Sequence, residues 1–424
     1  MLSTLRNAWK IEELRKRIIF TLLMLLVFRL GSNIPVPYMN KAIIADIFEK
    51  SRGGILEFLD LMGGGTFSNF SIFATNIYPY ITASIVIQLL TIAIPSLEEL
   101  AKQGEEGRKK ISKYTRYLGI GLALIQAIGY TFGLFSSALE TSNAFQNIIV
   151  ILSLVAGTAF LMWLGDLITE KGIGNGISLM IFIGIISKLP TEILEKATLI
   201  RYGYLSWIKE LIYIILLVII IAFVVALQEA ERKIPVQYAK RVVGRKMYGG
   251  QSTHIPVKVL MAGVIPVIFA SSLLAFPQTI ALFFKGEPSA WITKYLTPSG
   301  NVGIWIYSIL NIILILFFTY FYTAIQFNTV EYAKNLQQHG GFIPGIRPGR
   351  PTADYLNKVV MRITFVGGLS LAILASLPTI FSRIFGMTAN FTGTGIIIVV
   401  GVAIETVKQL EAQMVMRHYK GFLN

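Results

Sequence analysis

The chain of 424 residues contains no cysteine, and only 14% of its residues are charged. The absence of cysteine excludes disulfides, thiolate metal sites and cysteine nucleophiles. The low charge argues against a soluble domain, in which about 25% of the residues are charged. Hydrophobic residues occupy 54% of the positions instead. This composition predicts a polytopic membrane protein.

Groups that could support catalysis are also scarce. The three histidines, His254, His339 and His418, are far apart in the sequence and lack the spacing of a metal site. The apolar segments offer no paired carboxylates and no serine–lysine or serine–histidine dyad, so an intramembrane enzyme has little support. The stretch Gly172–Gly176 lacks the Lys-Ser/Thr pair of a nucleotide-binding loop, and we interpret it as a turn. We therefore expect no enzymatic activity, no metal, no cofactor and no nucleotide site.

Ten apolar segments approach the ~20 residues that a helix needs to cross a bilayer. They lie at residues 18–34, 73–94, 117–136, 146–168, 177–190, 208–228, 258–284, 304–327, 361–381 and 395–414. The fifth is short and the tenth carries Glu405, so nine spans is the alternative count. Ten spans divide into halves of five, and an odd number per half inverts the second half relative to the first. The predicted fold is all-helical, with inverted halves at residues 18–200 and 201–414.

Lys and Arg concentrate in alternate connecting segments, chiefly residues 6–17, 102–116, 232–258 and 334–362. Because positive charge in short loops stays in the cytoplasm, this pattern places both termini on the cytoplasmic side. Residues 1–17 form either a helix on that surface or a disordered tail, and residues 415–424 form a second tail. No small-residue cleavage pattern follows the first apolar segment, so we expect no cleaved signal peptide.

A six-residue pattern, Pro-x-Ile-x-Ala-Ser, occurs at Pro79–Ser84 and again at Pro266–Ser271. Each copy opens an apolar segment in its own half of the chain. Secondary transporters place polar or charged groups where their halves meet, whereas isoleucine offers only a bulky apolar side chain that excludes water. The repeat therefore favours an apolar gate over a ligand site. We expect Pro79, Pro266 and Pro277 to interrupt their helices as hinges, the alternative being that they only shape helix packing.

The segment Gly53–Gly65, between the first two spans, has glycines at both ends. Its central part can form about two helical turns, roughly 12 Å, which is too short to cross a membrane. The segment is either a re-entrant plug hinged by glycine or an amphipathic loop on the outer surface. The apolar residues of the plug would be Ile55, Leu56, Phe58, Leu59, Leu61 and Met62. For the ionisable residues in the spans, Arg29, Asp166 and Glu405, we expect structural roles, with Arg29 snorkelling outward or anchoring the outer end of the first helix.

Two long basic segments lie on the predicted cytoplasmic side. Residues 228–258 and 328–362 carry between them the candidates Lys240, Arg241, Arg245, Lys246, Arg347 and Arg350. Proline and glycine stiffen the tip around Arg347. Such clusters bind anionic lipid, nucleic acid or an acidic protein surface. Their length favours a docking partner, because orientation alone needs only a few charges beside each span.

Several stretches together resemble the SecY family of protein-conducting channels. They follow the family order over nearly the whole chain and comprise Ile34–Pro37, Pro79–Ser84, Thr169–Ser178, Tyr238–Arg241, Gln251–Pro256, Ala262–Pro266 and Phe342–Gly349. The resemblance implies a central pore between the halves, closed by a plug helix and narrowed by a ring of apolar side chains. Matched motif by motif, that ring consists of Ile77, Ile81, Ile181, Ile185, Ile268 and Ile398.

The resemblance also implies a lateral gate, with Pro79 and Pro266 on its helices and Thr82 and Gln126 in its polar cluster, although Ile265 departs from the family pattern. The implied partners are SecE and SecG in the membrane, the SecA ATPase or the ribosome on the basic loops, and signal peptides with unfolded preproteins as cargo. The implied function is movement of secretory proteins across the bacterial plasma membrane. A secondary transporter with inverted repeats is the main alternative.

Overall fold

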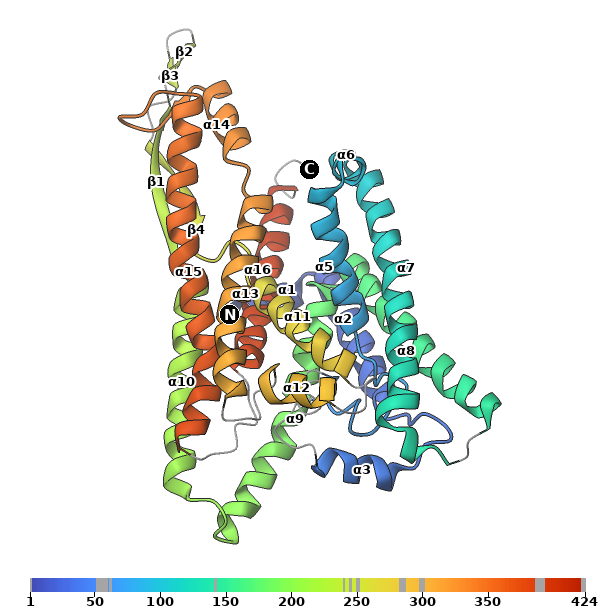
Figure 1. The fold of residues 1–424 in the computed structure, drawn as a ribbon. Coiled ribbons are helices and arrows are strands. Elements are labelled where there is room, and N and C mark those ends of the chain that lie inside the picture. The colour runs from blue at the N-terminus through green and yellow to red at the C-terminus, as the bar shows by residue number, and fades with distance from the viewer. Residues whose placement is uncertain are drawn as a thin grey trace.

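The structure is a computed structural model, and it describes residues 2–50, 60, 63–140, 143–238, 241–243, 246–248, 252–281, 287–296, 302–385 and 393–420. Helices make up most of this described chain (Figure 1). In the first part of the chain they are α1 (Leu2–Lys10), α2 (Glu12–Gly31), α3 (Lys41–Lys50), α5 (Tyr78–Ala93), α6 (Pro95–Lys102), α7 (Glu105–Gly129), α8 (Ala144–Lys171) and α9 (Gly176–Arg201). In the second part they are α10 (Trp207–Glu229), α11 (Ile265–Ala281), α12 (Glu287–Leu296), α13 (Gly303–Gln326), α14 (Thr329–Gln338), α15 (Arg350–Phe385) and α16 (Gly393–Lys420). A π-helical turn at Tyr130–Leu134 and a short 3-10 turn at Ser136–Ala138 follow α7.

Each predicted span coincides with a helix, namely α2, α5, α7, α8, α9, α10, α11, α13, α15 and α16 in chain order. Within the described residues, seven helices are long and apolar enough to cross a membrane, and α5 with α6 makes an eighth if this pair, bent by 101°, is taken together. Helix α11 is apolar but shorter, and α2 begins with charged residues. The chain is therefore a mostly helical polytopic membrane protein, as the composition predicts.

The fifth span is longer than its apolar run. The hydrophobic stretch ends at Pro190, yet α9 continues through this proline to Arg201 and reaches 26 residues. The extra turns are rich in residues that favour helix, such as leucine, glutamate and lysine. A buried ion pair ties them to α10, with Lys196 Nζ 2.6 Å from Glu210 Oε1 and side-chain exposures of 13% and 11%.

The turn predicted at Gly172–Gly176 joins α8 to α9. Gly174 has a φ of +82°, a conformation in which glycine is favoured because it lacks a Cβ atom. Asn175 caps α9, since its Oδ1 accepts the backbone N–H groups of Ile177 at 3.1 Å and Ser178 at 3.2 Å. The stretch is thus a helix-capping turn.

Two groups of helices flank the centre of the molecule. Figure 1 shows α5 to α8 on one side and α10, α13 and α15 on the other, with α11 between them. The two halves of the chain, residues 18–200 and 201–414, meet where α5 contacts α11 and where α9 contacts α16. The largest cluster of buried side chains draws residues from both groups, so the core of the protein lies across this junction.

The N-terminal segment is helical, the first of the two alternatives left by the sequence. Helix α1 packs on α2 and α16. Ala8 and Leu14 are buried in a small cluster with Leu410 of α16. The Thr4 hydroxyl donates to Glu411 Oε1 at 2.9 Å. This end of the chain is therefore tied to the last helix.

The long basic segments, which are predicted to be loops, form a small sheet. Strands β1 (Glu231–Tyr238) and β4 (Ser252–Lys258) pair antiparallel, and β5 (Gly341–Phe342) adds to the other edge of β1. Short strands β2 (Arg241–Val243) and β3 (Lys246–Tyr248) form a hairpin beyond them. Ile234 and Val236 alternate with exposed residues and are buried, which is the pattern of a strand with one face on a core. The prediction of loops here is wrong, because the buried face of β1 and its pairing with β4 make this region a sheet.

Candidate functional site

The six isoleucines singled out by the sequence lie in one buried cluster. Ile77 caps the start of α5, Ile81 lies in α5, Ile181 and Ile185 in α9, Ile268 in α11 and Ile398 in α16. None is more than 6% exposed. Their side chains carry no hydrogen-bonding group, so this part of the core offers water no partner. The structure thus brings together branched hydrocarbon from both halves of the chain.

The two copies of the repeat begin their helices in the same way. Tyr80 N and Ile81 N donate to the Ile77 carbonyl, and at the matching positions Val267 N and Ile268 N donate to the Val264 carbonyl.

A residue with a left-handed backbone conformation precedes the first turn of each of these helices. Asn76 has a φ of +54° and Gly263 a φ of +58°, and each stands three positions before its proline. The repeat is therefore conserved between the two copies in backbone conformation as well as in sequence.

The prediction that Pro79 and Pro266 interrupt their helices is wrong. Pro79 stands in the first turn of α5, and Pro266 is the second residue of α11. A helix tolerates proline there because the first backbone N–H groups have no partner within the helix. Pro277 does lie inside α11. In Figure 1, α5 leads up to α6 whereas α11 leads down to α12, so the two copies run in opposite directions.

A polar contact joins the two groups of helices beside the isoleucines. Tyr322 of α13 donates its hydroxyl to Gln88 Oε1 of α5. The Tyr322 ring also packs edge-on against Phe269 of α11, with ring centroids 5.2 Å apart. Gln88 in turn donates to Ser84 Oγ, the last residue of the first repeat copy, at 3.2 Å. A chain of side chains therefore runs from the repeat to the opposite half.

The predicted polar residues of the gate are buried in the first group of helices. Thr82 of α5 is 9% exposed and Gln126 of α7 is 8% exposed. These two helices pack against each other. The Gln126 side-chain oxygen has no hydrogen-bond partner within the described part of the chain. Ile265, the departure from the family pattern, is the first residue of α11.

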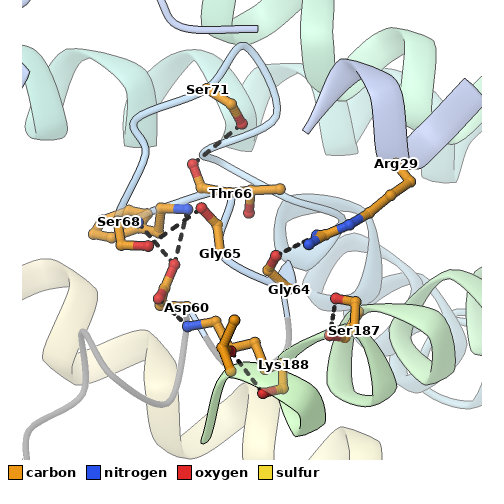
Figure 2. A network of polar contacts seen from close by, with 12 residues as sticks. Arg29, Asp60, Gly64, Gly65, Thr66, Ser68, Ser71, Ser187 and Lys188 are labelled. Atoms are coloured by element: carbon orange, nitrogen blue, oxygen red, sulfur yellow. Dashed lines mark hydrogen bonds and ion pairs between the residues drawn. The ribbon is translucent and has the colours of Figure 1, made fainter. Parts of the chain in front are cut away.

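The apolar plug residues Ile55, Leu56, Phe58, Leu59, Leu61 and Met62 lie outside the described residues. The end of the same segment is described, and Figure 2 shows it at the centre of a polar network. Asp60 is buried and forms an ion pair with Lys188 of α9. Arg29 of α2 donates to the Gly64 carbonyl at 2.5 Å. Arg29 therefore holds the C-terminal end of α2 to this loop, which fits the structural role predicted for it.

Asp166 also has a structural contact. Its Oδ2 lies 2.5 Å from Arg116 Nη2, which ties α8 to α7. Within the described residues, no group of three or more His, Cys, Asp or Glu side chains is placed to hold a metal ion.

Comparison with known proteins identifies the family of this fold. The SecY family model matches residues 71–407. The chain belongs to the SecY family. It is 47% identical over 436 aligned residues to the protein translocase subunit SecY of Halalkalibacterium halodurans, with 100% of both chains covered. It is 44% identical to the SecY subunit of Bacillus subtilis, again with both chains fully covered.

Solved structures agree with this SecY-family fold. A structure described as a protein conducting channel matches with a TM-score of 0.70 at 20% identity, covering 95% of this chain and 93% of the other. Sec61 in a canine ribosome–channel complex matches with a TM-score of 0.65 at 18% identity, covering 95% and 93%. At such identities the likeness shows the fold alone.

In this SecY-family chain the basic candidates fall into two groups. Arg347 is exposed on the tip between β5 and α15, and Arg350 is exposed as the first residue of α15. Arg241 and Lys246 belong to the hairpin strands β2 and β3, while Lys240 and Arg245 lie outside the described residues. The tip is held by Thr352, whose hydroxyl donates to the Arg347 carbonyl at 2.8 Å.

Sequence reasoning missed two contacts of this SecY-family site. Asp60 and Lys188 are 128 positions apart, and Gln88 and Tyr322 are 234 apart. For the contact between Asp60 and Lys188, the sequence offered one indication, a lysine near the C-terminal end of the short predicted fifth span. Nothing in the sequence pointed to the second.

Proposed function

We propose that this chain is the pore-forming subunit of a protein translocase, which moves unfolded secretory proteins across the plasma membrane and releases membrane segments sideways into lipid. The observation that carries the proposal is the convergence of six isoleucines from both halves in one buried cluster. Its support from relatives is full-length identity of 47% to a protein translocase subunit.

The isoleucines form the constriction of the pore. Branched hydrocarbon excludes water from a narrow passage and so limits the leak of ions. The same side chains have no preferred ligand, and they can rearrange around any passing peptide. With none of the six isoleucines more than 6% exposed, the arrangement described here corresponds to the closed pore.

The plug and the lateral gate complete the proposed mechanism. A related structure is described as showing that the plug domain of its SecY protein stabilises the closed state and maintains a membrane seal. Residues 53–65 are the equivalent plug of this chain. The lateral gate opens where α5 and α7 face α11 and α13, and it exposes Thr82 and Gln126 to an entering signal peptide.

The channel is passive and takes its energy from partners. Both termini and the basic sheet face the cytoplasm, where the SecA ATPase or the ribosome docks, and SecE and SecG accompany the chain in the membrane. Anionic lipids bind the same basic surface. The chain itself catalyses no reaction and binds no nucleotide. A secondary transporter is not favoured, because it needs polar or charged ligands where the halves meet, and isoleucines occupy that place.

Crosslinking of a stalled preprotein tests the pore directly. Single cysteines at Ile81, Ile185 and Ile268 are each expected to crosslink to the stalled chain, because the constriction surrounds it. The natural chain has no cysteine, so the background is clean. A cysteine at Leu22, exposed on α2, is the control and should stay unlinked. Equal crosslinking at Leu22 and at the isoleucines would contradict the proposal.

Removal of the Tyr322 hydroxyl is expected to ease separation of the halves. Tyr322→Phe breaks the bond to Gln88 Oε1 and leaves that oxygen unpaired. Hydrogen bonds between membrane helices contribute about 1 kcal/mol, which shifts the gate equilibrium roughly fivefold at most. The measurement is the export of a preprotein with a weakened signal sequence, which should rise.

The matched control is Tyr320→Phe on the same helix. The Tyr320 hydroxyl donates at 3.4 Å to the Met361 carbonyl of α15, within the same group of helices. This change should leave export of the weakened preprotein at the parental level. An equal rise for both variants would mean that the Gln88 contact has no special part in the gate.

A further inference from the structure

The ion pair between Asp60 and Lys188 belongs neither to the isoleucine constriction nor to the lateral gate. The Asp60 side chain is 6% exposed and that of Lys188 is 21% exposed. The two carboxylate oxygens of Asp60 have separate partners. Oδ1 accepts the backbone N–H groups of Phe67 at 3.1 Å and Ser68 at 2.7 Å, and Oδ2 binds Lys188 Nζ. Asp60 therefore shapes the loop with one oxygen and fastens it to α9 with the other.

The backbone of this loop lies directly on α9. Gly64 has a φ of +66°, and a Cβ atom added there would lie 2.8 Å from Gly184 Cα. No side chain at position 64 fits between the loop and the helix. From the opposite side, Arg29 Nη1 donates to the Gly64 carbonyl at 2.5 Å. The loop is thus held between α2 and α9 (Figure 2).

Lys188 lies on the face of α9 that carries two of the isoleucines. It follows Ile185 by three positions and Ile181 by seven, and such spacings place side chains on one face of a helix. The ion pair therefore lies about one turn beyond the isoleucine cluster along the same face. A displacement of that face from the pore axis would move Lys188 away from Asp60.

The surroundings of the pair make it dependent on the state of the pore. In a dry site the attraction between opposite charges is strong, and loss of one partner leaves the other charge buried and unpaired. In a water-filled pore each charged group is hydrated, so the ion pair adds little to the stability of the contact between the loop and α9. The ion pair therefore stabilises the closed, dry pore relative to the open, water-filled pore.

We propose that Asp60 and Lys188 form a latch that holds the loop of residues 63–68 against α9 in the closed channel, and that this pair separates when a polypeptide passes. The inference rests on the proposed function as a translocation channel. Within that function, Asp60 and Lys188 are positioning residues that stabilise the closed state. Arg29 supports the loop from α2 and stays bound to it.

Substitution of the pair tests the latch in the reconstituted channel with its partners. Lys188→Gln is expected to raise the ion leak of the resting channel about fivefold, because Asp60 is left without its partner. Asp60→Asn retains the oxygen that caps the loop, and it should raise the leak similarly. The double variant Asp60→Asn with Lys188→Gln leaves no unpaired charge, so its leak should be no greater than that of either single variant.

The matched control is the other buried ion pair on α9, Lys196 with Glu210. Its side chains are 13% and 11% exposed, a burial similar to that of the latch pair, but it lies within the α9–α10 hairpin. Lys196→Gln should lower the thermal stability of the protein without changing the leak. If Lys188→Gln changes the leak no more than Lys196→Gln does, the latch is overturned and the pair only supports the fold.

A reversible link gives the second test. Asp60→Cys and Lys188→Cys, joined by a short reducible bis-thiosulfonate reagent, should block preprotein translocation, and reduction should restore it. The same link between Lys196→Cys and Glu210→Cys should have no effect. Translocation at the unlinked rate through the channel linked at 60 and 188 would overturn the latch.

The proposed function and the latch give different results when each is wrong. If the unmodified chain with its partners translocates no preprotein, the proposed function is wrong. If the unmodified chain translocates and only the link or the substitutions have no effect, the latch alone is wrong.

Discussion

Replacement of Ile81 or Ile268 with serine is expected to raise the ion leak of the resting channel about tenfold, because each change removes apolar contact from the constriction and adds a hydroxyl. The buried side chain of isoleucine contributes roughly 1.5–3 kcal/mol, and loss of about 1.4 kcal/mol from the closed state alone corresponds to a tenfold shift. Both residues occupy the same position of the repeat and are 5% and 6% exposed. Conductance of reconstituted membranes without preprotein measures the effect.

The control for these variants is Ile220→Ser. Ile220 of α10 is 2% exposed and belongs to the same buried cluster, but it is not one of the six isoleucines. Its replacement should lower the stability of the protein by a similar amount and leave the conductance unchanged. If Ile81→Ser and Ile220→Ser give the same conductance, the isoleucines of the repeat do not form the constriction.

Local sequence patterns were sufficient to locate the helices of the predicted spans and to identify the repeat. Hydropathy located a helix at each predicted span, because a transmembrane helix must satisfy its backbone internally and face lipid with apolar side chains. The repeat identified Ile81 and Ile268, which lie in one cluster. The hinge prediction for Pro79 and Pro266 failed because hydropathy does not separate a proline within a helix from one in its first turn.

Contacts between distant segments could not be predicted from local sequence patterns. The pairs Asp60–Lys188 and Gln88–Tyr322 join helices that no short motif relates. The burial of Asp60 depends on how the loop folds back on α9, which follows from close glycine contacts in three dimensions. The sheet was different, since the alternation around Ile234 and Val236 was visible but was obscured by the surrounding basic residues.

The sheet gives a physical reason for the stiffness predicted at the second basic tip. Ile343, at the start of the tip, is buried in a cluster with Val236 of β1 and Leu356 of α15. Gly345 and Gly349 have φ angles of +82° and +96°, which favour glycine in these turns. Arg347 stands between them and is exposed. The fold therefore presents the Arg347 guanidinium on a rigid support.

Arg347→Glu is accordingly expected to slow preprotein translocation at least tenfold while leaving insertion of the channel intact. Close charge pairs at protein interfaces have coupling energies of about 1.5–7 kcal/mol, and reversal of one charge turns attraction into repulsion. The substitution touches no buried contact, because only the Arg347 carbonyl bonds to Thr352. Translocation driven by the motor ATPase measures the rate, and the amount of channel in the membrane measures insertion.

Lys358→Glu is the matched control, because Lys358 is also exposed but lies on the helical surface of α15 instead of the tip. This control reverses the same charge at a different place, so it should change the rate much less. If the two variants slow translocation equally, then overall basic charge, and not the guanidinium on the tip, recruits the partner. A normal rate for Arg347→Glu would place the docking surface elsewhere, and the hairpin of β2 and β3 with Arg241 and Lys246 would then be the next surface to test.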